Sequence, residues 1–195
     1  MEIKESTQIR EYDRELLAKI INKSIRSLSF PHNLKVIFHD EIFKLNTQQI
    51  VIEFSDFELK IVNHYHESVY NTGLKYLLLS KRNVANRPYN SSLEIEGFQD
   101  QVQSVEIWGI KNDMRLWEED QIKFYQSKGL IPGDVISIQH VVDLEHILRF
   151  VLSNGSYIII KADLQNLIFA ELYTSNQQSG FLELKENFHL WETIL

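Results

Sequence analysis

Apolar residues recur at every second position in several short runs, and this alternation constrains the fold more than any other feature. Ile50, Ile52 and Phe54 alternate with other residues, and after a polar break the same pattern continues at Leu59 and Ile61. Because side chains alternate between the two faces of a β-strand, a period of two predicts strands. Two such runs separated by a short polar break predict a β-hairpin over 50–62.

A second hairpin is predicted over 148–160, where the sequence Asn154-Gly155 separates two apolar runs. Asn-Gly is typical of a two-residue type I′ turn, because both residues tolerate positive φ angles. Apolar residues also occupy the intervening positions, so we expect a central pair of strands that is covered on both faces. The residues expected to be buried are Phe150, Val151, Leu152, Tyr157, Ile158 and Ile159.

The two predicted hairpins match when the first is shifted by 98 residues, which places Ile50 on Leu148 and Leu59 on Tyr157. The same shift predicts that Glu53 pairs with Lys60 across the first hairpin, as opposite charges favour. The sequence therefore predicts an internal duplication into two β-rich halves, 1–112 and 113–195, that form one compact unit.

A third hairpin is predicted between 93–95 and 105–107, with 97–101 as its turn. Apolar residues at spacings of three and four predict helices over 7–28 and 113–128. Ser6 or Thr7 could cap the first helix, Asp113 could cap the second, and Gly129 is placed to end the second.

Towards the end of the sequence, 164–173 fits either a helix or a strand, 181–184 fits a strand, and 188–195 fits a final docked turn. These elements predict an α+β fold. We expect mainly antiparallel β-sheet built from hairpins, with an N-terminal helix and one central helix.

Composition excludes several classes of function. The chain contains no cysteine, which rules out disulfides, Cys-ligated zinc, iron–sulfur clusters and thiol catalysis. No apolar run approaches the roughly 18 residues that span a bilayer, and the charged N-terminus does not resemble a signal peptide. We therefore expect a cytoplasmic protein that does not act at a membrane. A net charge of −7 argues against binding to nucleic acid.

The candidate metal ligands are His64, His66 and Glu67. Residues at i and i+2 share one face of a strand, so the two imidazoles could bind one zinc or iron ion. A site needs three or four ligands, and the sequence supplies too few nearby. We expect no bound metal and no other cofactor, and the sequence also lacks the common nucleophile and phosphate-loop motifs.

His140 and His146 flank Asp143 and Glu145. Such groups could serve in acid–base catalysis if a pocket held them together with shifted pKa values. The other interpretation, a solvated connector between strands, is the one that we expect. The sequence thus predicts no catalytic residue.

Charge is strongly segregated along the chain. Residues 91–120 contain eight acidic and two basic residues, a net charge of −6, whereas 68–92 contain four basic residues and no acidic one. Trp108 has the opposite strand parity to Val105 and Ile107, which predicts that it points outward beside Glu106. We expect one exposed surface that binds a basic protein partner and consists of Glu106, Trp108, Glu118, Glu119 and Asp120.

Three functions follow from these observations. The first is a non-catalytic protein-binding module that docks a basic partner through this acidic surface, a profile typical of inhibitors and of immunity proteins that antagonise toxins. The second is a metal-dependent enzyme or metal-binding protein that uses His64, His66 and Glu67. The third is a structural subunit of a larger assembly, whose oligomeric state the sequence does not define.

Overall fold

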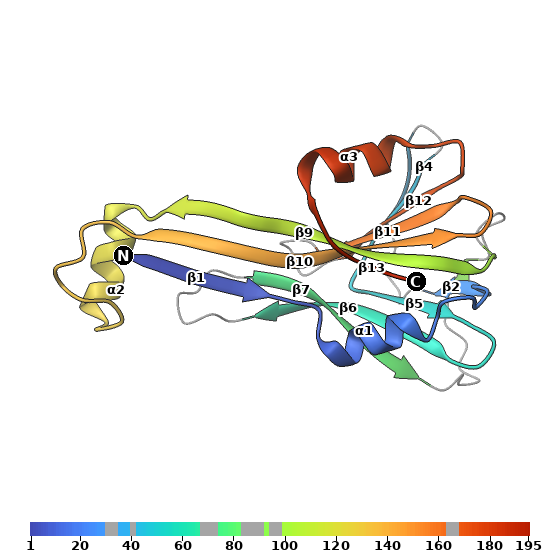
Figure 1. Ribbon diagram of the computed structural model, residues 1–195, viewed down its shortest axis with the longest axis horizontal. Helices are drawn as coiled ribbons and strands as arrows, with labels where there is room; N and C mark the ends of the chain where they lie inside the picture. Colours follow the sequence, from blue (N-terminus) through green and yellow to red (C-terminus); the bar gives the residue numbers. More distant parts are fainter. Residues whose placement is uncertain (30–34, 40–41, 67–73, 83–91, 94–98, 163–167) are drawn as a thin grey trace.

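The computed structural model describes residues 1–29, 35–39, 42–66, 74–82, 92–93, 99–162 and 168–195. The described residues form a two-sheet body from which a long arm extends, with the N-terminus near the end of the arm and the C-terminus in the body (Figure 1). This arrangement confirms an α+β fold of mainly antiparallel sheet.

The larger sheet has eight strands in the order β13-β9-β10-β11-β12-β4-β3, with β1 paired in parallel to β10. Its strands are β1 (Glu2–Thr7), β3 (Lys35–His39), β4 (Ile42–Thr47), β9 (Val102–Leu116), β10 (Gln139–Leu152), β11 (Tyr157–Ala162), β12 (Ile168–Tyr173) and β13 (His189–Ile194). The distal parts of β9 and β10 run together with β1 into the arm (Figure 1).

The smaller sheet has five strands in the order β7-β6-β5-β2-β8. Its strands are β2 (Ser27–Ser29), β5 (Gln49–Glu53), β6 (Glu58–His66), β7 (Leu74–Arg82) and β8 (Ser92–Leu93). The helices are α1 (Glu11–Ala18), α2 (Glu119–Ser127) and α3 (Ser179–Asn187). Among the described residues, no helix is long and apolar enough to span a membrane.

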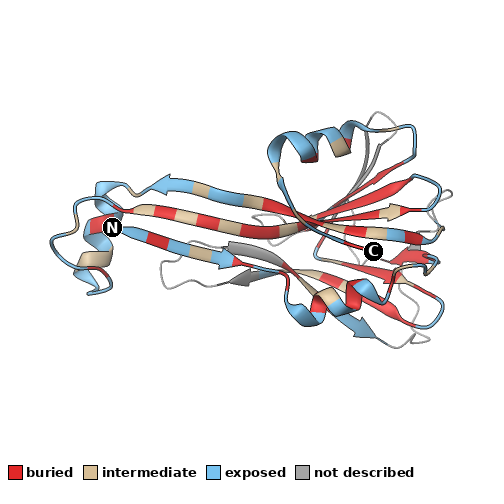
Figure 2. Ribbon diagram, viewed as in Figure 1, coloured by how far each residue is buried: buried red, intermediate tan, exposed pale blue. Residues whose placement is uncertain are grey.

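The main core lies between the two sheets. Side chains of β10 and β11, including Leu148, Phe150 and Ile158, pack in one cluster with Ile52 and Leu59 of the smaller sheet. Leu16 and Leu17 of α1 complete this cluster. Figure 2 shows the buried residues concentrated where the sheets face each other. Because residues of both predicted halves share this core, the strands of the body depend on one another for burial.

The opposite face of the larger sheet is covered by α3. Trp108, Tyr157, Ile159 and Tyr173 form a second cluster with Leu184 of the helix. The helix approaches so closely that a Cβ on Gly180 would lie 2.3 Å from the Tyr173 ring. The prediction that the β10–β11 hairpin is central and covered on both faces is therefore confirmed, with Val151 partly exposed.

The turn of this hairpin differs from the prediction. Val151 pairs with Tyr157 and the Leu152 N–H donates to the Ser156 carbonyl, which leaves a three-residue loop. Gly155 supplies the required positive φ of 83°. The extra residue inverts the parity of β11, so Tyr157 lies on the face opposite to that of Phe150.

The first hairpin also has a different register. Ile52 pairs with Leu59 and Glu53 with Glu58, because Phe57 belongs to the core and packs against Phe54 with ring centroids 5.3 Å apart. The predicted pairing of Glu53 with Lys60 is wrong. A uniform shift of 98 residues does not relate the two hairpins, and the duplication is not confirmed.

Two predicted helices are shorter than expected. The first is confined to α1, because residues 2–7 pair with β10 as a strand and Asn22 adopts a left-handed φ of 64° beyond the helix. The N-cap position of α1 is Arg10, not Ser6 or Thr7. Residues 27 and 28, which the prediction included in the helix, belong to β2 and pair with β5 instead.

The second predicted helix begins later, at Glu119, because β9 continues to Leu116 along β10. Asp113 therefore lies in a strand, and Glu118 caps α2 through a reciprocal capping box with Gln121. Gly129 follows the helix with a φ of 69°, as predicted. β9 also runs across residues 112 and 113, where the sequence placed the boundary between halves.

The remaining corrections concern strand partners. β8 pairs with β2 in the smaller sheet while β9 lies in the larger one, so the predicted third hairpin is wrong. Residues 168–173 form a strand, residues 181–184 lie in α3, and the predicted final turn is the edge strand β13. Residues 163–167 and 94–98 lie outside the described residues.

Candidate protein-interaction site

Trp108 does not form an exposed surface. Its side chain lies on the face of β9 opposite to Val105 and Ile107, as its parity predicts, but that face is covered by α3 and only 4% of the residue is accessible. The indole N–H donates to Glu106 at 2.8 Å, and the ring meets Phe181 edge-on at 6.3 Å. The prediction that Trp108 is exposed is therefore wrong.

Glu106 belongs to the same internal network. Both of its carboxylate oxygens accept from Nη1 of Arg149, at 2.9 and 3.0 Å. The Arg149 guanidinium in turn lies over the rings of Phe181 and Tyr157, at 4.0 and 4.5 Å from their centroids. The charge of Glu106 is thus neutralised beneath α3, which leaves it little attraction for an external basic partner.

Glu118, Glu119 and Asp120 lie elsewhere, at the start of α2 at the end of the arm (Figure 1). About ten residues of chain separate them from Trp108, which in an extended strand corresponds to roughly 30 Å. The predicted acidic residues therefore do not form one surface with Glu106 and Trp108. Those at the tip are all exposed.

The tip of the arm, residues 114–139 with the N-terminal residues 1–3, has a small core of its own. Ile3, Ile122, Ile131 and Ile138 cluster there, with Trp117 packed against them. The N-terminus helps to close this unit, since the Met1 amino group donates to the Ser137 carbonyl at 3.0 Å and the Gln139 N–H to the Met1 carbonyl at 2.9 Å. The tip is therefore an ordered structure.

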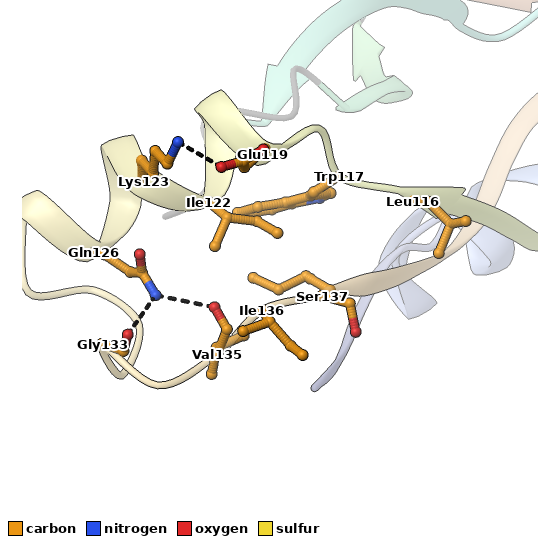
Figure 3. Close-up of a pocket in the computed structure, with 11 residues that line it drawn as sticks. Leu116, Trp117, Glu119, Ile122, Lys123, Gln126, Gly133, Val135, Ile136 and Ser137 are labelled. Carbon is orange, nitrogen blue, oxygen red and sulfur yellow. Dashed lines mark hydrogen bonds and ion pairs between the residues drawn. The ribbon is translucent and has the colours of Figure 1, made fainter.

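An open groove of about 440 Å³ lies between α2 and the segment that leads into β10 (Figure 3). Its lining is mostly apolar and includes Leu116, Trp117, Ile122, Val135, Ile136 and Ile138. The amide of Gln126 fixes one wall by donating to the carbonyls of Pro132, Gly133 and Val135. We call this feature the tip groove.

Large apolar side chains are unusually exposed around the tip groove. Ile136 is 92% exposed and Leu116 is 78% exposed, although both line the groove. Of the eleven large apolar residues exposed in the described part of the chain, six belong to the tip: Met1, Met114, Leu116, Phe124, Leu130 and Ile136. Concentrated apolar exposure on an ordered element is typical of an interaction site.

The charged residues that line the groove are one acid, Glu119, and one base, Lys123. Glu119 lines it and pairs with Lys123 one turn further along α2. This ion pair lowers the pKa of Glu119 and raises that of Lys123, and it neutralises both. Asp120 and Asp134 are exposed and adjoin lining residues in the sequence, Asp120 next to Glu119 and Asp134 between Gly133 and Val135.

The predicted metal ligands are only partly described. His64 lies on β6 and is exposed, whereas the side chain of His66 and all of Glu67 lie outside the described residues. Within the described part of the chain, no group of three or more potential ligands could hold a metal ion. The alternative of a metal site at these three residues therefore stays untested, because two of the ligands are not described.

Residues 140–146 do not form a solvated connector, because all of them lie within β10. His140 is buried and its Nε2 lies 2.9 Å from Glu5 on β1. Glu145 is buried and accepts from the Ile9 N–H and from Arg14. Burial lowers the pKa of His146 to about 4. These groups form internal contacts that fix strand positions.

The sequence did not reveal the tip groove, because its walls come from two separate segments, residues 116–126 and 133–138, and Leu116 was assigned to the predicted helix over 113–128. The overlooked signal was the number of large apolar side chains in these two segments, which is more than one buried face needs. Comparison of the chain with models of protein families, with curated proteins and with solved structures gives no match.

Proposed function

We propose that the chain is a non-catalytic protein-binding module that holds its partner at the tip groove. The observation that carries this proposal is the concentration of exposed apolar side chains at the end of an ordered arm, where two of them, Leu116 and Ile136, line an apolar groove. Leaving Ile136 and Leu116 in water is unfavourable by about 25 cal/mol per Å² of apolar surface, and a bound partner would remove that cost.

The chemistry of the groove defines the partner segment. Its apolar floor accepts one or two large apolar side chains, and the exposed acids Asp120 and Asp134, which adjoin lining residues in the sequence, favour basic residues that flank those side chains. We therefore still expect a basic partner, but we place its binding site at the tip and not at Trp108. An inhibitor or immunity-type antagonist would use such a surface to cover a basic target.

Affinity capture from the native source with matched variants tests this proposal. Ile136→Asp places a charge at the groove, while Leu195→Asp places the same charge at a residue of the body that is 86% exposed. Both variants should fold, because neither side chain is buried. We expect a protein that is retained by wild type and by Leu195→Asp and lost with Ile136→Asp, with retention that weakens as salt screens Asp120 and Asp134. Equal retention by both variants would contradict a tip-groove function.

A further inference from the structure

β9 has an open edge along the arm. β13 pairs with β9 from Val105 to Gly109 and goes no further, whereas β9 continues to Leu116 with β10 on its inner side. No strand in the described part of the chain pairs with the outer side of β9 beyond Gly109. In Figure 1 this outer edge runs free from the level of α3 to α2. An unpaired edge presents N–H and C=O groups that can accept another strand.

The direction of these groups follows from one hydrogen bond. The Trp117 N–H donates to the Ile138 carbonyl on the β10 side. Because backbone groups alternate between the two sides of a strand, those of Asp113 and Arg115 also point to β10, and those of Met114 and Leu116 point outward. A bulge at Asn112, which has a φ of 54°, ends the regular edge on its other side. The available edge is thus Asp113–Leu116.

This short edge is complementary to itself. When two identical strands pair antiparallel, the residue at the centre of the pair faces the same residue of the other copy. A pair centred on Asp113 therefore places two aspartates opposite each other, and a pair centred on Arg115 places two arginines opposite each other. A centre at Met114 places Asp113 opposite Arg115 of the partner subunit twice, and it also matches the outward-pointing backbone groups of the two Met114 residues. Opposite charges across a pair stabilise it and like charges destabilise it. We propose that two copies of the chain dimerise by pairing their β9 edges about Met114.

The side chains of this edge are available for the contact. Asp113 and Arg115 already form an ion pair at 2.7 Å within one chain, with both side chains partly exposed. In the dimer the two ion pairs would become one cluster of four charges. Met114 is 62% exposed and would pack against its symmetry mate.

The geometry also limits the assembly. A two-fold pairing uses the same edge of both copies, so it closes at a dimer. The bulge at Asn112 keeps the ladder short, and a short ladder buries less than the roughly 1,200 Å² of a stable interface. The dimer should therefore form and dissociate with protein concentration.

Cysteine cross-linking tests the register directly, because the chain has no cysteine of its own. Pairing about Met114 places the two Cα atoms of that residue about 5.5 Å apart, within the range of about 4.4–6.8 Å that a disulfide spans. The two Leu116 residues would be four positions apart along the strands, about 13 Å. We expect Met114→Cys to form disulfide-linked dimers under mild oxidation and the more exposed Leu116→Cys to remain monomeric. Equal cross-linking of the two variants, or none in Met114→Cys, overturns the proposal.

Charge reversal tests the same pairing without cross-linking. Asp113→Arg or Arg115→Asp alone should abolish the concentration-dependent dimer in sedimentation velocity, and the double exchange should restore it because both opposed pairs are again complementary. A double exchange that stays monomeric, or wild type that is monomeric at every concentration, contradicts the proposal. Ile136→Asp, which tests the tip groove, should leave cross-linking of Met114→Cys unchanged, so failure of one proposal is distinguishable from failure of the other.

Discussion

Replacing Glu145 by leucine should show how strongly a buried charge in the middle of β10 supports the fold. The carboxylate is buried where β1 ends and the chain enters α1. It accepts from the Ile9 N–H at 2.9 Å and from Nη2 of Arg14 at 2.7 and 2.9 Å. Glu145→Leu removes all three interactions at once.

The magnitude follows from the groups that are left behind. Ile9 would keep a buried N–H without an acceptor, and Arg14, whose side chain is 19% exposed, would keep only Glu192 at 2.9 Å as an acidic partner. Removing one member of a buried ion pair typically costs about 3–5 kcal/mol. Glu145→Gln keeps one acceptor for Ile9, so its cost should be nearer the 1.5–3 kcal/mol or so of a hydrogen bond to a charged group.

Urea denaturation of the wild type, Glu145→Leu, Arg14→Met and the double variant measures these effects. Because the two side chains interact directly, the double variant should lose less free energy of unfolding than the two single variants lose together. We expect this difference to be at least about 1 kcal/mol. A free energy of unfolding for Glu145→Leu within about 1 kcal/mol of wild type, or strictly additive effects, would refute this account of the contact.

Three further outcomes are expected. Burial lowers the pKa of His146 to about 4 from an ordinary 6.5, so between these two pH values the unfolded chain binds a proton that the folded chain does not. The free energy of unfolding should therefore fall by on the order of 3 kcal/mol as the pH is lowered from 6.5 to 4. Denaturation series across pH should show that His146→Leu removes this component. Gly109→Ala should strongly lower the thermal midpoint, since its Cβ would lie 1.6 Å from the Leu144 carbonyl oxygen, whereas Gly133→Ala has no neighbour within 4 Å and should be neutral. Phe150→Ala should cost about 3–5 kcal/mol in urea denaturation, because the ring is fully buried between the sheets, and a near-wild-type midpoint would contradict that position.

The positions of the body strands could be predicted because burial on one face of a strand is a local pattern. The alternation around Ile52 and Phe150 correctly located β5, β11 and the parts of β6 and β10 that adjoin the two turns. The pairing between those strands depended on single residues at the turns. Phe57 enters the core instead of the turn, and the second loop holds one residue more than expected, so both registers shifted.

The site was harder to predict, because burial of an opposite face depends on distant segments. The parity of Trp108 was correct, but its exposure depended on α3, more than seventy residues later in the sequence. The first part of the helix predicted over 113–128 was wrong for a similar reason. β9 extends because β10 lies beside it, and the apolar residues at 114 and 116 occupy a strand whose outer edge is open.

The internal polar contacts of β10 explain how this long strand keeps one register with its neighbours. Three ionisable residues of β10 each bind a different element: His140 binds Glu5 on β1, Glu145 binds Arg14 on α1, and Arg149 binds Glu106 on β9. A slip of one residue would turn every side chain of β10 to the other face and separate all three pairs at once. Since a buried charge without its partner is costly, these pairs disfavour alternative registers more than apolar contacts would. The arm can then present exposed apolar groups at its tip in a defined position, which is what specific binding requires.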